Sequence, residues 1–142
     1  MKPVTRLLAA IMIALAMGNA AYAARAGKPM QLHLDNPIRT LNTATPGKTE
    51  IENAIIRAGM QRNWIITRNG DGTLNAHLAI RQHTLDVTIV LKDTTYDIVY
   101  KNSTNLQYAP NPDDPARPII HPSYDKWVDN LIGDIRVQLA QL

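Results

Sequence analysis

Residues 74–101 read LNAHLAIRQHTLDVTIVLKDTTYDIVYK, and this stretch decides the fold. Apolar side chains occupy every second position in three consecutive runs, 74–80, 85–91 and 96–101. A period of two predicts strands with one face on a core and one face in water, the pattern of an antiparallel sheet. Connections this short can only form hairpins. The stretch therefore predicts an antiparallel meander.

A fourth strand and a helix precede the meander. The run 64–67 is strand-like, and residues 69–72 (NGDG) are a strong turn signal before the next strand. Upstream, Thr49 and Glu52 match a capping box, so a helix is expected to begin at Thr49 and to end near Arg62. Its buried stripe is formed by residues at helical spacing, Ile51, Ala54, Ile55 and Ala58.

A second helix is expected at the C-terminal end. It begins near Pro122, with His121 or Ser123 as its cap. Its apolar stripe consists of Val128, Leu131, Ile132, Ile135 and Leu139. Both helices have one apolar stripe and the sheet has one apolar face, so the helices should cover that face together. The predicted fold is α+β, a two-layer sandwich of order αββββα, with an extra N-terminal strand possible at residues 30–34.

The register of the meander can also be predicted. In the first long hairpin, Ile80 is expected to face Leu85. In the second, a longer loop would set Asp86 against Lys101, whereas a two-residue turn would set Asp86 against Val99. We favour the longer loop because opposite charges attract across a ladder. The side chains expected to be most buried lie centrally on the apolar face and are Leu78, Val87, Ile89 and Ile98.

The first 23 residues have the three parts of a secretory signal peptide. Lys2 and Arg6 precede an apolar run of 11 residues, 7–17, and Ala21 and Ala23 provide small residues for cleavage. The run is too short for the roughly 20 residues of a membrane-spanning helix, which argues against the alternative of a signal anchor. We expect cleavage near Ala23 and a periplasmic product in a Gram-negative host.

Composition narrows the possible functions of the mature chain. Loss of Lys2 and Arg6 leaves 13 basic and 12 acidic side chains without a basic cluster, so nucleic acid is not an expected partner. The chain has no cysteine, which excludes thiol catalysis, cysteine metal sites and a lipid on an N-terminal cysteine. The expected organisation is a signal peptide at 1–23, a lead-in at 24–48 and one domain at 49–142.

Motifs for catalysis or cofactor binding are weak. The four histidines, His33, His77, His83 and His121, lack the spacing of a metal site, and no cofactor is expected. Nucleophile-elbow, phosphate-loop and dinucleotide motifs do not occur. A non-catalytic module that binds another envelope protein is therefore the favoured function. The alternative is a small periplasmic hydrolase or ligand-processing enzyme that uses His121 with a nearby carboxylate.

The best candidate surface is polar and aromatic. Asn105 and Tyr108 follow the last strand, and His121 and Tyr124 begin the last helix. The proline-rich loop 109–118 joins these segments, so they could meet at one end of the sheet. The alternative is a structural role, in which Asn105 satisfies backbone groups and the tyrosines close the edge of the core.

A second candidate pair lies at the turn of the first long hairpin. Arg81 and His83 flank this turn and could present a small cationic site for an anionic ligand. Exposed loop charges are more often simply solvated.

A set of residues spread over most of the mature chain matches a pattern known from other proteins. Its members are Ala54, Ile55, Ile56, Ala58, Arg62, Trp64, Leu74, Ala76, Leu78, Arg81, His83, Tyr96, Ile98, Tyr100, Ser103, Asn105, Leu106, Tyr108, Ile120, His121, Tyr124, Trp127, Val128, Asn130, Leu131, Asp134 and Ile135. With them the chain resembles, from Ile51 to Leu139, a family of small bacterial envelope proteins, many described as lipoproteins and without an established activity. The resemblance implies location and fold but no mechanism. The chain departs from the family in lacking the lipid-acceptor cysteine and in a longer loop at 109–118.

Overall fold

The computed structural model describes residues 27–142, so the predicted signal peptide lies outside the described residues. The elements in chain order are β1 (Lys28–Pro29), β2 (His33–Pro37), α1 (Lys48–Met60), β3 (Ile65–Arg68), β4 (Leu74–Ile80), β5 (His83–Leu91), β6 (Thr95–Thr104), β7 (Ile119–Ile120) and α2 (Ser123–Leu139). Within residues 27–142, no helix combines the length and the apolar character that crossing a membrane requires.

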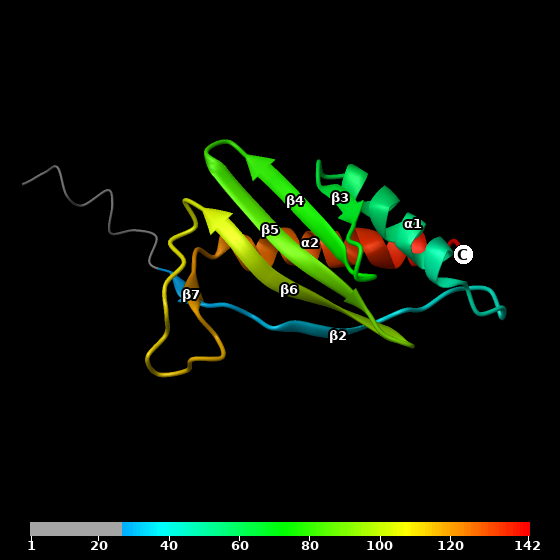
Figure 1. Ribbon diagram of the computed structural model, residues 1–142, viewed down its shortest axis with the longest axis horizontal. Coiled ribbons are helices and arrows are strands. Elements are labelled where there is room, and N and C mark those ends of the chain that lie inside the picture. The colour runs from blue at the N-terminus through cyan, green and yellow to red at the C-terminus, as the bar shows by residue number, and fades with distance from the viewer. Residues whose placement is uncertain (1–26) are drawn as a thin grey trace, which may run out of the picture.

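The main sheet has five antiparallel strands in the order β2-β6-β5-β4-β3 (Figure 1). The predicted α+β fold and its meander are confirmed, and the extra N-terminal strand is present. That strand comprises residues 33–37 rather than 30–34. A second sheet, formed by β1 and β7, was not predicted, because its two-residue strands carry no periodic signal.

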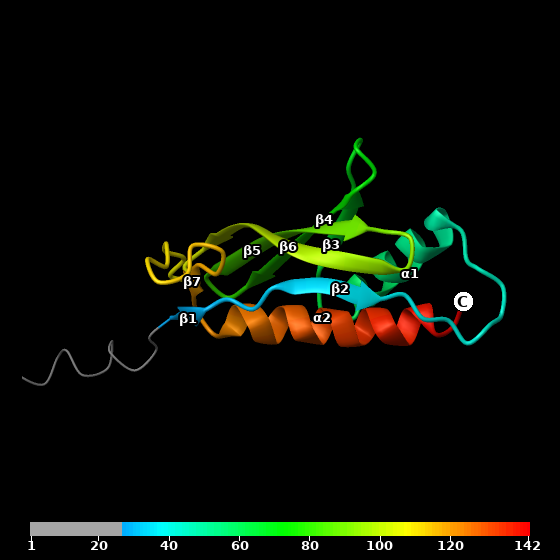
Figure 2. The ribbon, with the colours of Figure 1, turned by 90° about the horizontal axis from the view of Figure 1, so that it is seen from below.

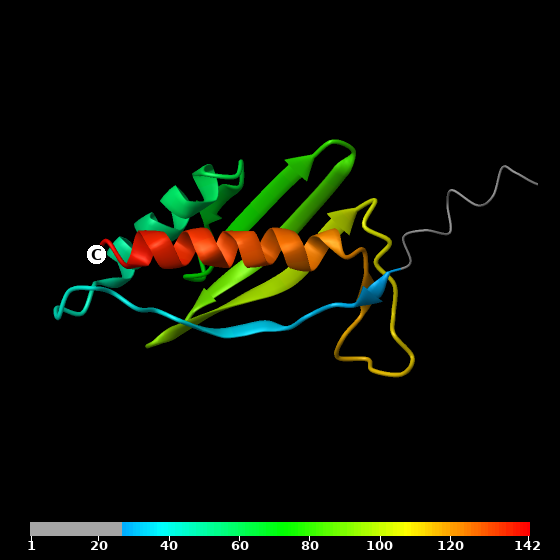
Figure 3. The same ribbon diagram turned by 180° about the vertical axis from the view of Figure 1, so that it is seen from behind.

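The two helices pack against each other and cover the apolar face of the sheet (Figures 2 and 3). Helix α1 approaches β3 so closely that a Cβ atom on Gly59 would lie 2.5 Å from Cδ1 of Ile66, which explains why glycine occupies this position. The four side chains predicted to be most buried, Leu78, Val87, Ile89 and Ile98, are at most 2% exposed. The predicted inward face is therefore confirmed.

The helix starts agree only in part with the sequence patterns. The backbone N–H of Gly47 donates to Oε2 of Glu50 at 2.8 Å, so the predicted capping box of Thr49 and Glu52 was wrong by two residues. Glu52 is buried instead and accepts from Nε of Arg68 at 2.7 Å. At the start of α2 the N-cap is Pro122, neither of the two predicted residues, although Nδ1 of His121 accepts the backbone N–H of Ser123 at 3.1 Å.

The register of the first long hairpin differs from the predicted one by two residues. Ile80 faces His83 rather than Leu85, and Leu85 faces Leu78. The reason is a two-residue turn at residues 81–82, in which Arg81 adopts a left-handed backbone with φ of 55°. A shift of two keeps every apolar side chain on the same face, so the alternation could not distinguish the two registers.

The second long hairpin has the longer loop, but it contains a β-bulge. Val99 faces Thr88 as the longer loop requires, whereas Asp86 faces Asn102 and not Lys101. Lys101 is the extra residue of β6, which one-to-one pairing could not anticipate. The predicted pair of Asp86 and Lys101 is therefore wrong, and Asp86 instead contacts Nδ1 of His77 on β4 at 2.9 Å.

Candidate binding site beside strand β6

Strand β6 continues beyond the end of its neighbour β2. The two strands pair from Thr95 to Ile98, where Ile98 faces His33. Residues 99–104 of β6 have no strand on that side within the described part of the chain, and we call them the open edge. The chain before β2 turns away instead, and the backbone N–H of Met30 donates to the carbonyl of Pro118 at 2.8 Å. Figure 1 shows β2 and β6 separating at this point.

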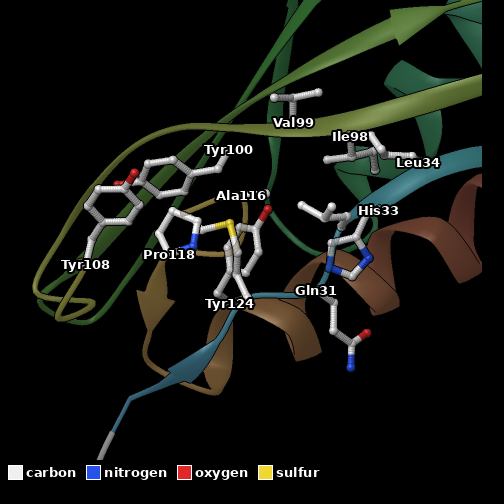
Figure 4. Close-up of a pocket in the computed structure, with 12 residues that line it drawn as sticks. Gln31, His33, Leu34, Ile98, Val99, Tyr100, Tyr108, Ala116, Pro118 and Tyr124 are labelled. Carbon is white, nitrogen blue, oxygen red and sulfur yellow. The ribbon is translucent and has the colours of Figure 1, made fainter. Parts of the chain in front are cut away.

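A cavity of about 190 Å³ lies where the two strands separate (Figure 4). We call it the edge cavity. Its walls come from the segment around β2, from β6, from the loop before β7 and from the start of α2. The lining includes Met30, His33, Ile98, Tyr100, Tyr108, Pro118 and Tyr124.

Three tyrosines form the aromatic wall of the edge cavity. Tyr100 and Tyr108 are stacked, with ring centroids 4.4 Å apart and an angle of 1° between the planes. Tyr124 meets Tyr100 edge-on at 5.9 Å. Burial raises the pKa of Tyr124 and of Tyr100, so both remain neutral phenols at physiological pH. The ring of Tyr108 is accessible, since this residue is 46% exposed. The wall is therefore aromatic, and Tyr100 and Tyr124 contribute no charge to it.

A buried carboxylate holds the chain before β2 against α2. Asp125 is 3% exposed, and its Oδ1 accepts the backbone N–H of Gln31 at 3.0 Å and lies 3.3 Å from Nε2 of His33. Its Oδ2 lies 3.3 Å from Nζ of Lys28 but makes no hydrogen bond. These contacts attach the segment before β2, part of which lines the edge cavity, to α2.

His33 is not arranged as a general base. Its Nε2 faces Asp125 at 3.3 Å and its Nδ1 faces Asp129 at 3.5 Å, so both ring nitrogens are directed at carboxylates. A general base needs one nitrogen directed at the substrate. His33 therefore contributes to the wall and to the attachment of β2.

The loop before β7 is ordered by its own hydrogen bonds. Asn111 is 8% exposed, and its side-chain amide donates to the carbonyl of Arg117 at 3.0 Å. Nε of Arg117 donates to the carbonyl of Met30, also at 3.0 Å. Most of this proline-rich loop is exposed, and part of it, at Ala116 and Pro118, lines the edge cavity.

Four of the predicted site residues, Arg81, His83, Asn105 and His121, come together at the β4–β5 turn, and we call them the hairpin cluster. Nδ1 of His83 lies 2.8 Å from the carbonyl oxygen of Asn105, and the amide of Asn105 donates to the carbonyl of Gln82 at 2.7 Å. The rings of His83 and His121 lie 6.3 Å apart. Arg81 is exposed in the turn. The polar groups of His83 and Asn105 thus bond to the backbone, as the structural alternative expected.

The other two predicted residues, Tyr108 and Tyr124, line the edge cavity. Sequence reasoning missed His33, Tyr100 and Asp125. In the alternating run 30–34, the apolar Leu32 and Leu34 are 52% and 47% exposed, whereas the polar His33 is buried. No local signal marks this inversion.

Within residues 27–142, no group of three or more histidine and acidic side chains could hold a metal ion.

The comparisons with known proteins found no relative of this chain. The chain matches no family model, no curated protein and no solved structure.

Proposed function

We propose that this protein is a non-catalytic binding module of the bacterial periplasm that holds another envelope protein at the open edge of β6. The single observation that carries the proposal is the coincidence of unpaired strand edge and cavity. An exposed edge presents unpaired N–H and C=O groups that pair readily with another chain. An apolar cavity beside it offers a place for a partner side chain. The periplasmic location rests on the predicted signal peptide.

The attachment of β2 supports this role. Binding sites are more effective when they exist before the partner arrives, because less ordering is needed on association. The buried contacts of Asp125 and the hydrogen bond from Arg117 to Met30 hold the segment before β2 in place against α2 and the loop before β7. The site is therefore preformed.

Site-specific photo-cross-linking tests the proposal. The full chain is expressed in a Gram-negative host with a photoreactive amino acid in place of Tyr108, which lies at the cavity. A matched variant carries it in place of Met60, which is 71% exposed on α1. We expect a discrete protein adduct from position 108 that is absent from position 60. Equal labelling from both positions, or none from position 108, would contradict the proposal.

Export is tested on the same material. Mass spectrometry of the periplasmic fraction should find an N-terminus at or within a few residues of Ala24. An intact Met1 in the membrane fraction would contradict the predicted location.

A further inference from the structure

The chemistry of the open edge restricts what can bind there. Lys101 is exposed and is the bulged residue of β6. Its Nζ lies 3.3 Å from the amide oxygen of Asn75, and no carboxylate lies within 4.0 Å of it among residues 27–142. A lysine and a bulge on a strand edge disfavour pairing with another edge of the same kind. A second copy of this chain is therefore a poor occupant.

The size of the edge cavity restricts the occupant further. An apolar cavity of about 150 Å³ holds one benzene molecule. The edge cavity, at about 190 Å³, therefore has room for one leucine- or phenylalanine-sized side chain and not for a large ligand. Tyr100 points toward it from β6, and strand partners directly opposite each other share a face of the sheet. A residue placed opposite Tyr100 would thus direct its side chain into the edge cavity (Figure 4).

We propose that the occupant is an extended segment of a partner protein that pairs with the open edge and inserts one large apolar side chain, the anchor, into the edge cavity. An acidic residue adjacent to the anchor in the partner's sequence faces Lys101. Neighbouring residues of a strand point to opposite faces, so the acid follows or precedes the apolar anchor directly. Main-chain hydrogen bonds supply affinity in this mode, and the anchor supplies specificity. The inference rests on the proposed function and adds the chemistry of the partner.

Selection from a displayed library of random 12-residue peptides tests the inference. The target is the protein purified from the periplasm of expressing cells. We expect enrichment of peptides in which Asp or Glu is adjacent to a large apolar residue. The best of these is then synthesised with a fluorescent label for measurement of Kd. Enrichment of another pattern, such as proline-rich sequences, overturns the inference, and so does an absence of enrichment. Cross-links at position 108 would in that case leave the proposed function standing.

Variants locate the peptide. Tyr108→Ala should weaken binding about tenfold, as loss of a central aromatic contact does, whereas Tyr108→Phe should keep the affinity within about twofold. Lys101→Glu should weaken binding about fivefold, and a peptide with Lys in place of its acid should bind this variant better than the original protein. Arg39→Glu makes the same change of charge on an exposed residue beyond the other end of β2 and should have no effect. Binding that is unaffected by both Tyr108→Ala and Lys101→Glu overturns the inference.

Backbone methylation tests strand pairing directly. Alternate N–H groups of an added strand point toward β6, so N-methylation of one alternating set of peptide residues should abolish binding and methylation of the other set should be tolerated. Equal tolerance of both sets overturns pairing with the open edge.

Discussion

The hairpin cluster and the edge cavity both contain residues predicted to form a binding surface, but they differ in how their hydrogen-bonding groups are used. In the hairpin cluster, Asn105 and His83 bond to the turn and to the strand end, and the turn is closed by the protein itself. At the edge cavity, the polar side chains hold the walls in place, while residues 99–104 of β6 pair with β5 on one side and have no strand on the β2 side within residues 27–142. The difference indicates where a partner can bind. A collection of polar residues is weak evidence for a binding site, whereas an unpaired backbone edge beside a preformed cavity is strong evidence for one.

The largest expected effect lies in the core that both regions share. Ile89 is fully buried, so Ile89→Ala should lower the free energy of unfolding by ~2–5 kcal/mol, measured by chemical denaturation. Val90→Ala on the opposite, partly exposed face is the control and should cost less than ~1 kcal/mol. Equal costs would contradict the assignment of Ile89 to the buried face of β5.

A smaller effect separates the two regions. Asp125→Asn removes the buried charge that holds Gln31 and His33, and it should lower the free energy of unfolding by ~1–3 kcal/mol. It should also weaken peptide binding, because the β2 wall loosens. Asp93→Asn is the control, since Asp93 is exposed between β5 and β6, away from this attachment, and should matter little. If Asp125→Asn leaves binding unchanged, the edge cavity does not depend on this attachment.

Low pH should also destabilise the contacts between β2 and β6. Burial of Asp97 raises its pKa, but the ion pair with Nζ of Lys92 at 2.8 Å and the N–H donated by Asp35 together hold this pKa below its ordinary value. A depressed carboxyl pKa contributes stability above the unfolded value near 3.8, and that contribution is lost as the pH falls through the folded pKa. Asp97→Asn should therefore make the unfolding free energy less dependent on pH below about 4. An unchanged acid dependence would show that other carboxylates dominate.

The hairpin cluster should affect stability and not binding. Asn105→Ala removes the bond to Gln82 and places alanine at φ of 58°, a left-handed backbone that Asn tolerates better. We expect a loss of ~1–2 kcal/mol in the unfolding free energy and an unchanged peptide Kd. Asn105→Gly loses the same bond without the strain, so it should be less destabilising by ~0.5–1 kcal/mol. A large change in Kd for either variant would place the binding site at the hairpin cluster instead.

These two regions also show what the sequence can predict. Alternation in 74–101 correctly indicated the strands, their inward face and the antiparallel meander, because burial on one face demands a period of two. It could not determine the register of the first long hairpin, since pairing Ile80 with His83 or with Leu85 keeps the same side chains on the inward face. The turn geometry at Arg81 decides between them.

The edge cavity was less predictable because it depends on contacts distant in sequence. Tyr108 and Tyr124, on the two segments that loop 109–118 joins, both line the edge cavity. The inward position of His33 follows from Asp125, which is 92 residues away. The separation of β2 from β6 follows from the bond between Met30 and Pro118. Neither contact leaves a periodic pattern.

The smallest expected effect is the most specific one. Lys101 lies at a bulge, and in the described structure its Nζ has one weak, exposed hydrogen bond, 3.3 Å long, to the side-chain oxygen of Asn75. Lys101→Ala should therefore change the free energy of unfolding by less than ~0.5 kcal/mol, as most surface substitutions do. Asp86→Asn, which weakens the contact to His77, should cost slightly more, ~0.2–1 kcal/mol. Chemical denaturation of both variants gives the comparison.

If Lys101→Ala is the more destabilising of the two, the lysine maintains the bulge and has a structural role. If it is neutral for stability and still weakens binding of the acidic peptide, its charge serves the partner, because an exposed lysine that contributes nothing to the fold can affect the affinity only through contact with what binds.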